Sequence, residues 1–251
     1  MERESFEIYT AGGNRLHATA MWPEMPDALI CLIHCKGQKS DDYDAMANFF
    51  MDHNMAFFTC DLHGHGQSAD TEKHSNSVAD YANDIEALCM LARSEFNEIP
   101  ILLVGVGLGA LATVYYLSKN KSSEISACIL FDPWLGNSTQ FLQVSPLAGL
   151  VGFFLPLLKL KNVANSGAQT ITYKLVKSVK RTNDILYSSQ DSIRVKTLIF
   201  AKFDNSNVPN LLSAHPEMIE MLPLPDAALC ASNQTWLSLL GWINNLRGIK
   251  N

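Results

Sequence analysis

The sequence predicts an α/β protein with a mostly parallel central sheet, helices on both of its faces and an inserted helical cap. Short, continuously apolar runs recur along the chain with amphipathic helical patterns between them, which is typical of parallel strands buried on both faces. Residues 134–192 interrupt this alternation, and a long insertion at the carboxyl edge of such a sheet commonly roofs a binding crevice. We therefore divide the chain into a core, residues 1–133 and 193–251, and a cap, residues 134–192.

The first elements are predicted as an antiparallel hairpin followed by a buried strand and a helix. Residues 5–9 and 14–22 alternate polar and apolar side chains around a Gly-Gly turn. The apolar run Ala28–His34 then predicts the first buried strand. Residues 40–53 follow with a helical pattern, for which Ser40 is the expected N-cap.

The same strand and helix unit repeats through the remaining core. Further apolar runs predict strands, and helical patterns between them predict helices, the longest of which has Ser77 as its expected N-cap. The strands lie at residues 55–62, 101–105, 127–132 and 197–201, and the helices at residues 77–96, 110–119 and 235–246. In the cap, residues 172–186 predict a helix, and the apolar residues 145–160 predict a lid or a core helix, because this run is too short to span a bilayer.

Composition limits the classes of partner. The chain has 251 residues, 47% of them apolar, and 19 Lys and Arg against 25 Asp and Glu give a net charge of −6, which argues against nucleic acid and anionic membranes. The only basic cluster is Lys174, Lys177, Lys180 and Arg181. Residues 1–13 contain charges and no apolar signal-peptide core, so we expect a cytoplasmic protein with no integral membrane segment. The six cysteines lack zinc-site spacing and are expected as reduced thiols, and no motif implies a metal or another cofactor.

Three motifs follow one another at regular points of the predicted core. They read HCKGQKSDDY at residues 34–43, CDLHGHGQS at residues 60–68 and DYANDI at residues 80–85. Together with the order of the elements, they resemble the α/β-hydrolase fold superfamily, in its monoacylglycerol lipase and lysophospholipase branch. In that branch the first motif is an H-G-x-G oxyanion segment, in which Cys35 here replaces a glycine.

The resemblance also shows where this chain departs from a hydrolase. The nucleophile of such enzymes lies in a sharp G-x-S-x-G turn between strand and helix, and the corresponding turn here is GVGLG, with Gly107 at the serine position. The segment FAKFDNSNVP resembles the one that carries the triad acid, which assigns this position to Asp204. No histidine lies between Glu217 and Trp236, and Leu229 or Cys230 stands at the expected histidine position.

The other candidate site residues come from the same alignment and from the predicted cap. The resemblance places the backbone N–H groups of Lys36 and Leu108 where an oxyanion hole would form. Side chains expected at the crevice come from the carboxyl ends of strands, from the lid and from the degenerate histidine position; they are His34, Cys35, Asp132, Phe153, Phe154 and Cys230.

Four functional hypotheses remain open at this stage. The first is a binding protein that holds a small apolar or acyl-like molecule in the capped crevice, or a protein partner or second copy around it. The second is a repurposed lyase, isomerase or cyclase that uses the oxyanion site and Asp204 as general acid or base. The third is dinucleotide binding through GVGLGA, and the fourth is hydrolysis through a displaced triad. Because the serine and histidine positions are both degenerate, serine hydrolase activity is not expected.

Overall fold

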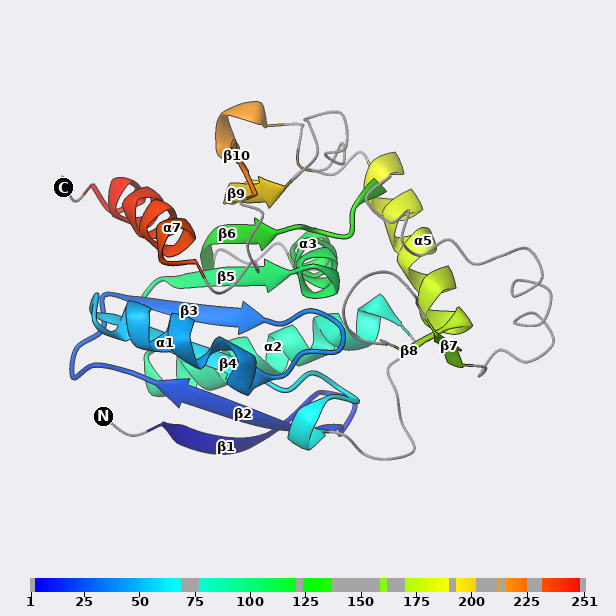
Figure 1. The fold of residues 1–251 in the computed structure, drawn as a ribbon, viewed down its shortest axis with the longest axis horizontal. Helices are drawn as coiled ribbons and strands as arrows, with labels where there is room; N and C mark the ends of the chain where they lie inside the picture. The colour runs from blue at the N-terminus through cyan, green and yellow to red at the C-terminus, as the bar shows by residue number, and fades with distance from the viewer. Residues whose placement is uncertain are drawn as a thin grey trace.

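The structure is a computed structural model in which a twisted eight-stranded sheet is flanked by helices (Figure 1). It describes residues 3–68, 77–120, 124–136, 159–161, 170–189, 193–201, 212, 215–224 and 232–248, with the backbone alone at 159–161 and 170–173. The strands of the main sheet are β1 (Glu4–Tyr9), β2 (Arg15–Met21), β3 (Ala28–Ile33), β4 (Met55–Cys60), β5 (Ile101–Val106), β6 (Ile125–Phe131), β9 (Lys196–Ala201) and β10 (Ile219–Pro223). A separate two-stranded sheet pairs β7 (Lys159–Lys161) with β8 (Thr170–Thr172).

The sheet confirms the predicted fold class. Its order is β1-β2-β4-β3-β5-β6-β9-β10, in which β1, β2 and β4 pair antiparallel and every pairing from β4 to β10 is parallel. Strands β3, β4 and β5 are buried along their whole length, as their continuous apolar sequences predict. The carboxyl ends of the parallel strands therefore meet at one edge of the sheet.

Helices cover both faces of the sheet. They are α1 (Asp44–Met51), α2 (Val78–Glu95), α3 (Leu108–Lys119), α5 (Tyr173–Ser188) and α7 (Asn233–Leu246), with the 3₁₀ turns η1 (Ser40–Tyr43), η2 (Gly66–Ser68) and η5 (Pro216–Met218). The helices α1 and α7 pack on one face, and α2 and α3 pack on the other, so each face has its own apolar cluster. Helix α5 lies beyond the carboxyl ends of the strands, as Figure 1 shows.

The two predicted N-caps have different outcomes. Ser77 caps α2 as predicted, because its hydroxyl accepts a hydrogen bond from the backbone N–H of Ala79 at 3.0 Å. The prediction for Ser40 is wrong: Lys39 is the N-cap, and Ser40 is the first residue of η1, with its backbone N–H donated to the carboxylate of Asp61 at 2.7 Å. A contact with a residue 21 positions away thus replaces the local cap.

No helix in the described part of the chain is long and apolar enough to cross a membrane. The described part of the predicted cap consists of residues 134–136, β7, β8, α5 and Ser189. Helix α5 confirms the helix predicted at residues 172–186, while the apolar run at 145–158 lies outside the described residues.

Candidate ligand site at the carboxyl edge of the sheet

The turn between β5 and α3 has the backbone geometry of a sharp strand-to-helix elbow. Gly107 stands at its tip with φ 55° and ψ −112°, a conformation that favours glycine, and its N–H donates to the carbonyl of Phe131 at 2.9 Å. The flanking glycines allow close packing: a Cβ on Gly105 would lie 2.6 Å from Cα of Ala110, and one on Gly109 would lie 2.6 Å from the carbonyl oxygen of His34. The sequence prediction of a tight strand-to-helix turn is therefore confirmed.

The space above Gly107 is filled by the side chain of Cys35. A Cβ built on Gly107 would overlap the sulfur of Cys35 and lie 3.3 Å from its Cβ and 3.2 Å from Nε1 of Trp134. The backbone N–H groups of Lys36 and Leu108 lie beside this sulfur and lower the pKa of its thiol. The structure thus brings together the two donors assigned to an oxyanion hole, and the thiol of Cys35 occupies the position between them.

The environment of Cys35 keeps its sulfur protonated. Burial raises the pKa of the thiol to about 11, although the two N–H donors act in the opposite direction. The charge of Asp132 raises the pKa further, and the ammonium of Lys36 lowers it. Because a thiolate is the reactive form of cysteine, this side chain has the properties of a packed thiol and lacks those of an activated nucleophile.

The histidines of the neighbouring loops are structural. His34 is fully buried; its Nδ1 donates to the carbonyl of Cys35 at 2.8 Å and its Nε2 accepts from the N–H of Leu62 at 2.9 Å. Burial lowers the pKa of His34 to about 4 and that of His65 to about 3. Nζ of Lys36 donates to Nε2 of His65 at 3.2 Å. His34 was predicted as a pocket side chain, but it lies inside the loop network because both ring nitrogens satisfy backbone groups.

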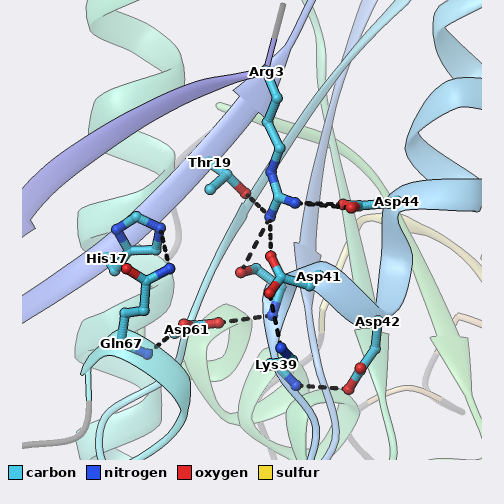
Figure 2. A network of polar contacts seen from close by, with 10 residues as sticks. Arg3, His17, Thr19, Lys39, Asp41, Asp42, Asp44, Asp61 and Gln67 are labelled. Atoms are coloured by element: carbon cyan, nitrogen blue, oxygen red, sulfur yellow. Dashed lines mark hydrogen bonds and ion pairs between the residues drawn. The ribbon is translucent and has the colours of Figure 1, made fainter.

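A carboxylate fixes the two loops beside the site (Figure 2). One oxygen of Asp61 accepts the N–H of Ser40 and the other accepts the N–H of Gln67, each at 2.7 Å. Arg3, which directly precedes β1, then ties the N-terminal segment to η1 and α1 through ion pairs with Asp41 and Asp44, both at 2.8 Å. The segment that carries Cys35 is therefore held at a fixed place over Gly107 by residues distant in sequence.

The segment that follows β6 forms another wall of the site. Asp132 has a positive φ of 41°, and its N–H donates to the carbonyl of Phe200 at 2.7 Å. Trp134, which sequence reasoning did not select, donates its backbone N–H to the carbonyl of Gly107 at 3.2 Å. Asn183 of α5 accepts from Gly136 at 2.8 Å and donates to the carbonyl of Trp134 at 3.1 Å. The sequence signal that could have pointed to Trp134 is its position two residues after Asp132, which follows the carboxyl end of β6.

Five of the predicted site residues lie outside the described part of the chain: Phe153, Phe154, Asp204, Leu229 and Cys230. Among the described residues, no group of three or more His, Cys, Asp or Glu side chains could hold a metal ion. Two surface grooves are described, and both lie away from Gly107. One of about 600 Å³ lies between β10 and α7, and one of about 690 Å³ lies between α2 and α3.

Comparisons with known proteins give matches over more than half of the chain. Residues 24–201 match the family described as serine aminopeptidase, S33. The monoglyceride lipase of Rattus norvegicus is 26% identical over 143 residues, which are 56% of this chain and 47% of that protein. The matched segment spans half or less of the length of the curated relatives.

Solved structures show the same fold over the whole chain. A thermostable carboxyl esterase from Bacillus coagulans superposes with a TM-score of 0.72 at 12% identity, covering 98% of this chain and 99% of that one. A soluble variant of monoglyceride lipase from Saccharomyces cerevisiae also has a TM-score of 0.72 at 15% identity, covering 100% of this chain and 97% of the other. These likenesses establish the α/β-hydrolase fold predicted from the sequence.

Proposed function

The chain belongs to the serine aminopeptidase S33 family, and we propose that it is a non-hydrolytic member that binds a small apolar or acyl-like molecule, or a protein partner, in or around the capped crevice at the carboxyl edge of the sheet. One observation carries the proposal. The sulfur of Cys35 stands where a seryl side chain would stand, beside both N–H groups that an oxyanion would need.

Hydrolysis on this scaffold needs three groups that the proposal treats as lost. A nucleophile would have to extend from the elbow, but Gly107 has no side chain and Cys35 fills the space. An oxyanion would need the N–H groups of Lys36 and Leu108, which lie beside the thiol. A base would need a histidine on the loop before α7, where the sequence has none; His215, upstream of β10, contacts Glu217 at 3.2 Å.

The chemistry of the ligand is inferred from the relatives and from the predicted lid. Similar proteins are monoglyceride lipases and a carboxyl esterase, and the solved yeast lipase carries a substrate analogue. These names support a neutral molecule with an acyl chain. The apolar residues 145–158, including Phe153 and Phe154, favour the same class.

The first test is native mass spectrometry of the purified protein before and after incubation with an extract of its source cells. We expect a reproducible added mass, and its identity gives the ligand. The variant Cys35→Leu extends a side chain into the crevice and should weaken binding at least about tenfold, as expected for overfilling a packed site. Cys89→Ala, which changes a buried residue of α2, is the matched control. Binding that survives Cys35→Leu unchanged would place the ligand elsewhere.

Absence of hydrolysis is tested separately with a fluorophosphonate probe and a short-chain chromogenic ester. We expect neither labelling nor ester cleavage above the rate of a heat-denatured sample. Labelling of any serine with accompanying turnover would overturn the non-hydrolytic part of the proposal. The binding experiment does not depend on this outcome.

A second candidate function is a repurposed enzyme that needs no covalent step. The observation that favours it is Asp132, a non-glycine residue at φ 41° whose charge acts on Cys35, because backbone strain of this kind clusters at active sites. Asp204 would then be a further acid or base. Once a ligand is identified, conversion of that ligand by the protein and at least about tenfold slower conversion by Asp132→Asn would support this candidate. A ligand recovered chemically unchanged would exclude it.

A further inference from the structure

The outer face of α5 presents four cations in one band. Lys174, Lys177, Lys180 and Arg181 are all exposed, while Leu175, Val176, Val179 and Leu186 are buried. At 100° per residue, the four basic side chains lie within an arc of about 120° on the helix surface. We call this set the α5 basic face.

Four cations share the arc of the α5 basic face with one exposed carboxylate, Asp184, so the face carries a net charge of +3. Within the part of the chain that the structure describes, none of the four side chains makes an ion pair or a hydrogen bond. Asp184 is the one acidic residue of α5, and it also makes no ion pair with another described residue. These cations are therefore available to an external anion.

Charge is segregated along the chain as well. Residues 133–183 contain six Lys and Arg and no Asp or Glu, which leaves 13 Lys and Arg against 25 Asp and Glu in all other residues. The segment thus carries +6 and the remainder −12. Lys159 and Lys161 belong to this segment and lie on β7, whose partner β8 runs directly into α5. The overall charge of −6 hides this division.

The α5 basic face is also held rigidly and points away from the sheet. Ser178 accepts the N–H of Val78 at 3.0 Å, and Asn183 binds the segment after β6, so the inner side of the helix is fixed to the core. Figure 1 shows α5 at the end of the molecule beyond the carboxyl ends of the strands. Neither the groove between β10 and α7 nor the one between α2 and α3 is lined by residues of α5.

We propose that the α5 basic face docks the protein on an anionic phospholipid surface. Cations on one exposed helix face are complementary in charge to a layer of phosphate headgroups. The net negative charge of the remaining residues is repelled by the same surface, which favours the orientation with α5 towards the lipid. Docking is peripheral and depends on salt, and it is independent of whether the site above Gly107 binds or converts its ligand.

The test is co-sedimentation of the full chain with vesicles of phosphatidylcholine alone or with roughly 30% phosphatidylserine. We expect binding only to the anionic vesicles at low salt, and release at about 0.5 M salt, where the Debye length is only a few ångströms. The variant Lys177→Glu/Arg181→Glu should lower the partition coefficient at least about 30-fold, since each cation near the surface contributes about fivefold. Lys174→Glu/Lys180→Glu, an independent pair on the same face, should have a similar effect.

The matched control is Lys119→Glu/Lys196→Glu, which changes the net charge equally with exposed lysines of α3 and β9. The control should bind like the wild type. Equal loss in the control would show that total charge decides and would overturn the assignment to α5. Wild-type binding in both α5 pairs would overturn it as well. Capture by immobilised polyglutamate without binding to anionic vesicles would identify an acidic protein partner in place of the lipid surface.

Discussion

Asp84 of α2 is a buried carboxyl group whose ionisation should control how stability changes with pH. Its side chain is 1% exposed; one oxygen accepts the N–H of His63 at 2.9 Å, and the other has no hydrogen-bond partner among the described residues. Burial raises the pKa of Asp84 to about 7, the N–H of His63 lowers it, and the charge of Asp80 raises it further. The perturbation is Asp84→Asn, which keeps an acceptor for His63 and removes the titration.

The magnitude follows from the difference between the pKa values of the native and unfolded states. A carboxyl group with a native pKa of about 7 and an unfolded pKa of 3.8 binds more protons in the native state between these values, so the free energy of unfolding falls as pH rises. A difference of about three pKa units corresponds to about 4 kcal/mol in total, of which about 3 kcal/mol is lost between pH 5 and pH 8. Below about pH 4 both states hold the proton, so this group causes no further change of stability with pH.

The assay is urea unfolding of the wild type and of Asp84→Asn at pH 5 and pH 8. We expect the wild type to lose about 3 kcal/mol more than the variant between the two pH values. Glu86→Gln, which removes an exposed carboxylate of the same helix, should follow the wild type. If Asp84→Asn and the wild type change equally with pH, Asp84 is not protonated in the native state near neutrality, and the reasoning from its burial is refuted.

Other side chains of the site give further measurable outcomes. The native pKa of His34 is about 4 and its ordinary value is 6.5, so between these pH values only the unfolded state binds the proton. The free energy of unfolding should therefore fall by roughly 3 kcal/mol as pH falls from 6.5 to 4. Urea unfolding of His34→Asn should lack this pH-dependent loss. Alkylation of Cys35 by iodoacetamide should accelerate up to about pH 10, because the pKa of its thiol is about 11, and a plateau near pH 8 would contradict this. Gly107→Ser should reduce the free energy of unfolding by roughly 1–3 kcal/mol, because the new Cβ meets Cys35 and the backbone has a positive φ. Cys35→Gly in the same chain should recover most of this loss. A double-mutant cycle without coupling between the two positions would show that the cysteine is no obstacle.

Much of the fold could be predicted because local pattern and burial agree. The runs that form β3 and β5 are apolar without interruption, and both strands are buried at every position. Gly109 could be predicted as a position of close approach, since the strand-to-helix turn needs glycines there. Ser40 could not be placed correctly, because its backbone N–H binds Asp61, a contact that depends on where another loop lies.

The site was only partly predictable for a similar reason. The alignment of motifs placed Gly107 at the elbow and named the N–H donors of Lys36 and Leu108. It did not predict that the sulfur of Cys35 would lie between them, since that position depends on the distance between loops from two different strands. The available signal was that Cys35 places a side chain where the H-G-x-G segment has none.

The fit between Cys35 and Gly107 has a consequence for how this sequence can evolve. A serine at position 107 would meet the sulfur of Cys35, so introducing that side chain first would disturb the elbow. Replacing the cysteine first would leave unfilled space above Gly107. Each single substitution is therefore expected to be unfavourable, so positions 35 and 107 are coupled and are expected to change together.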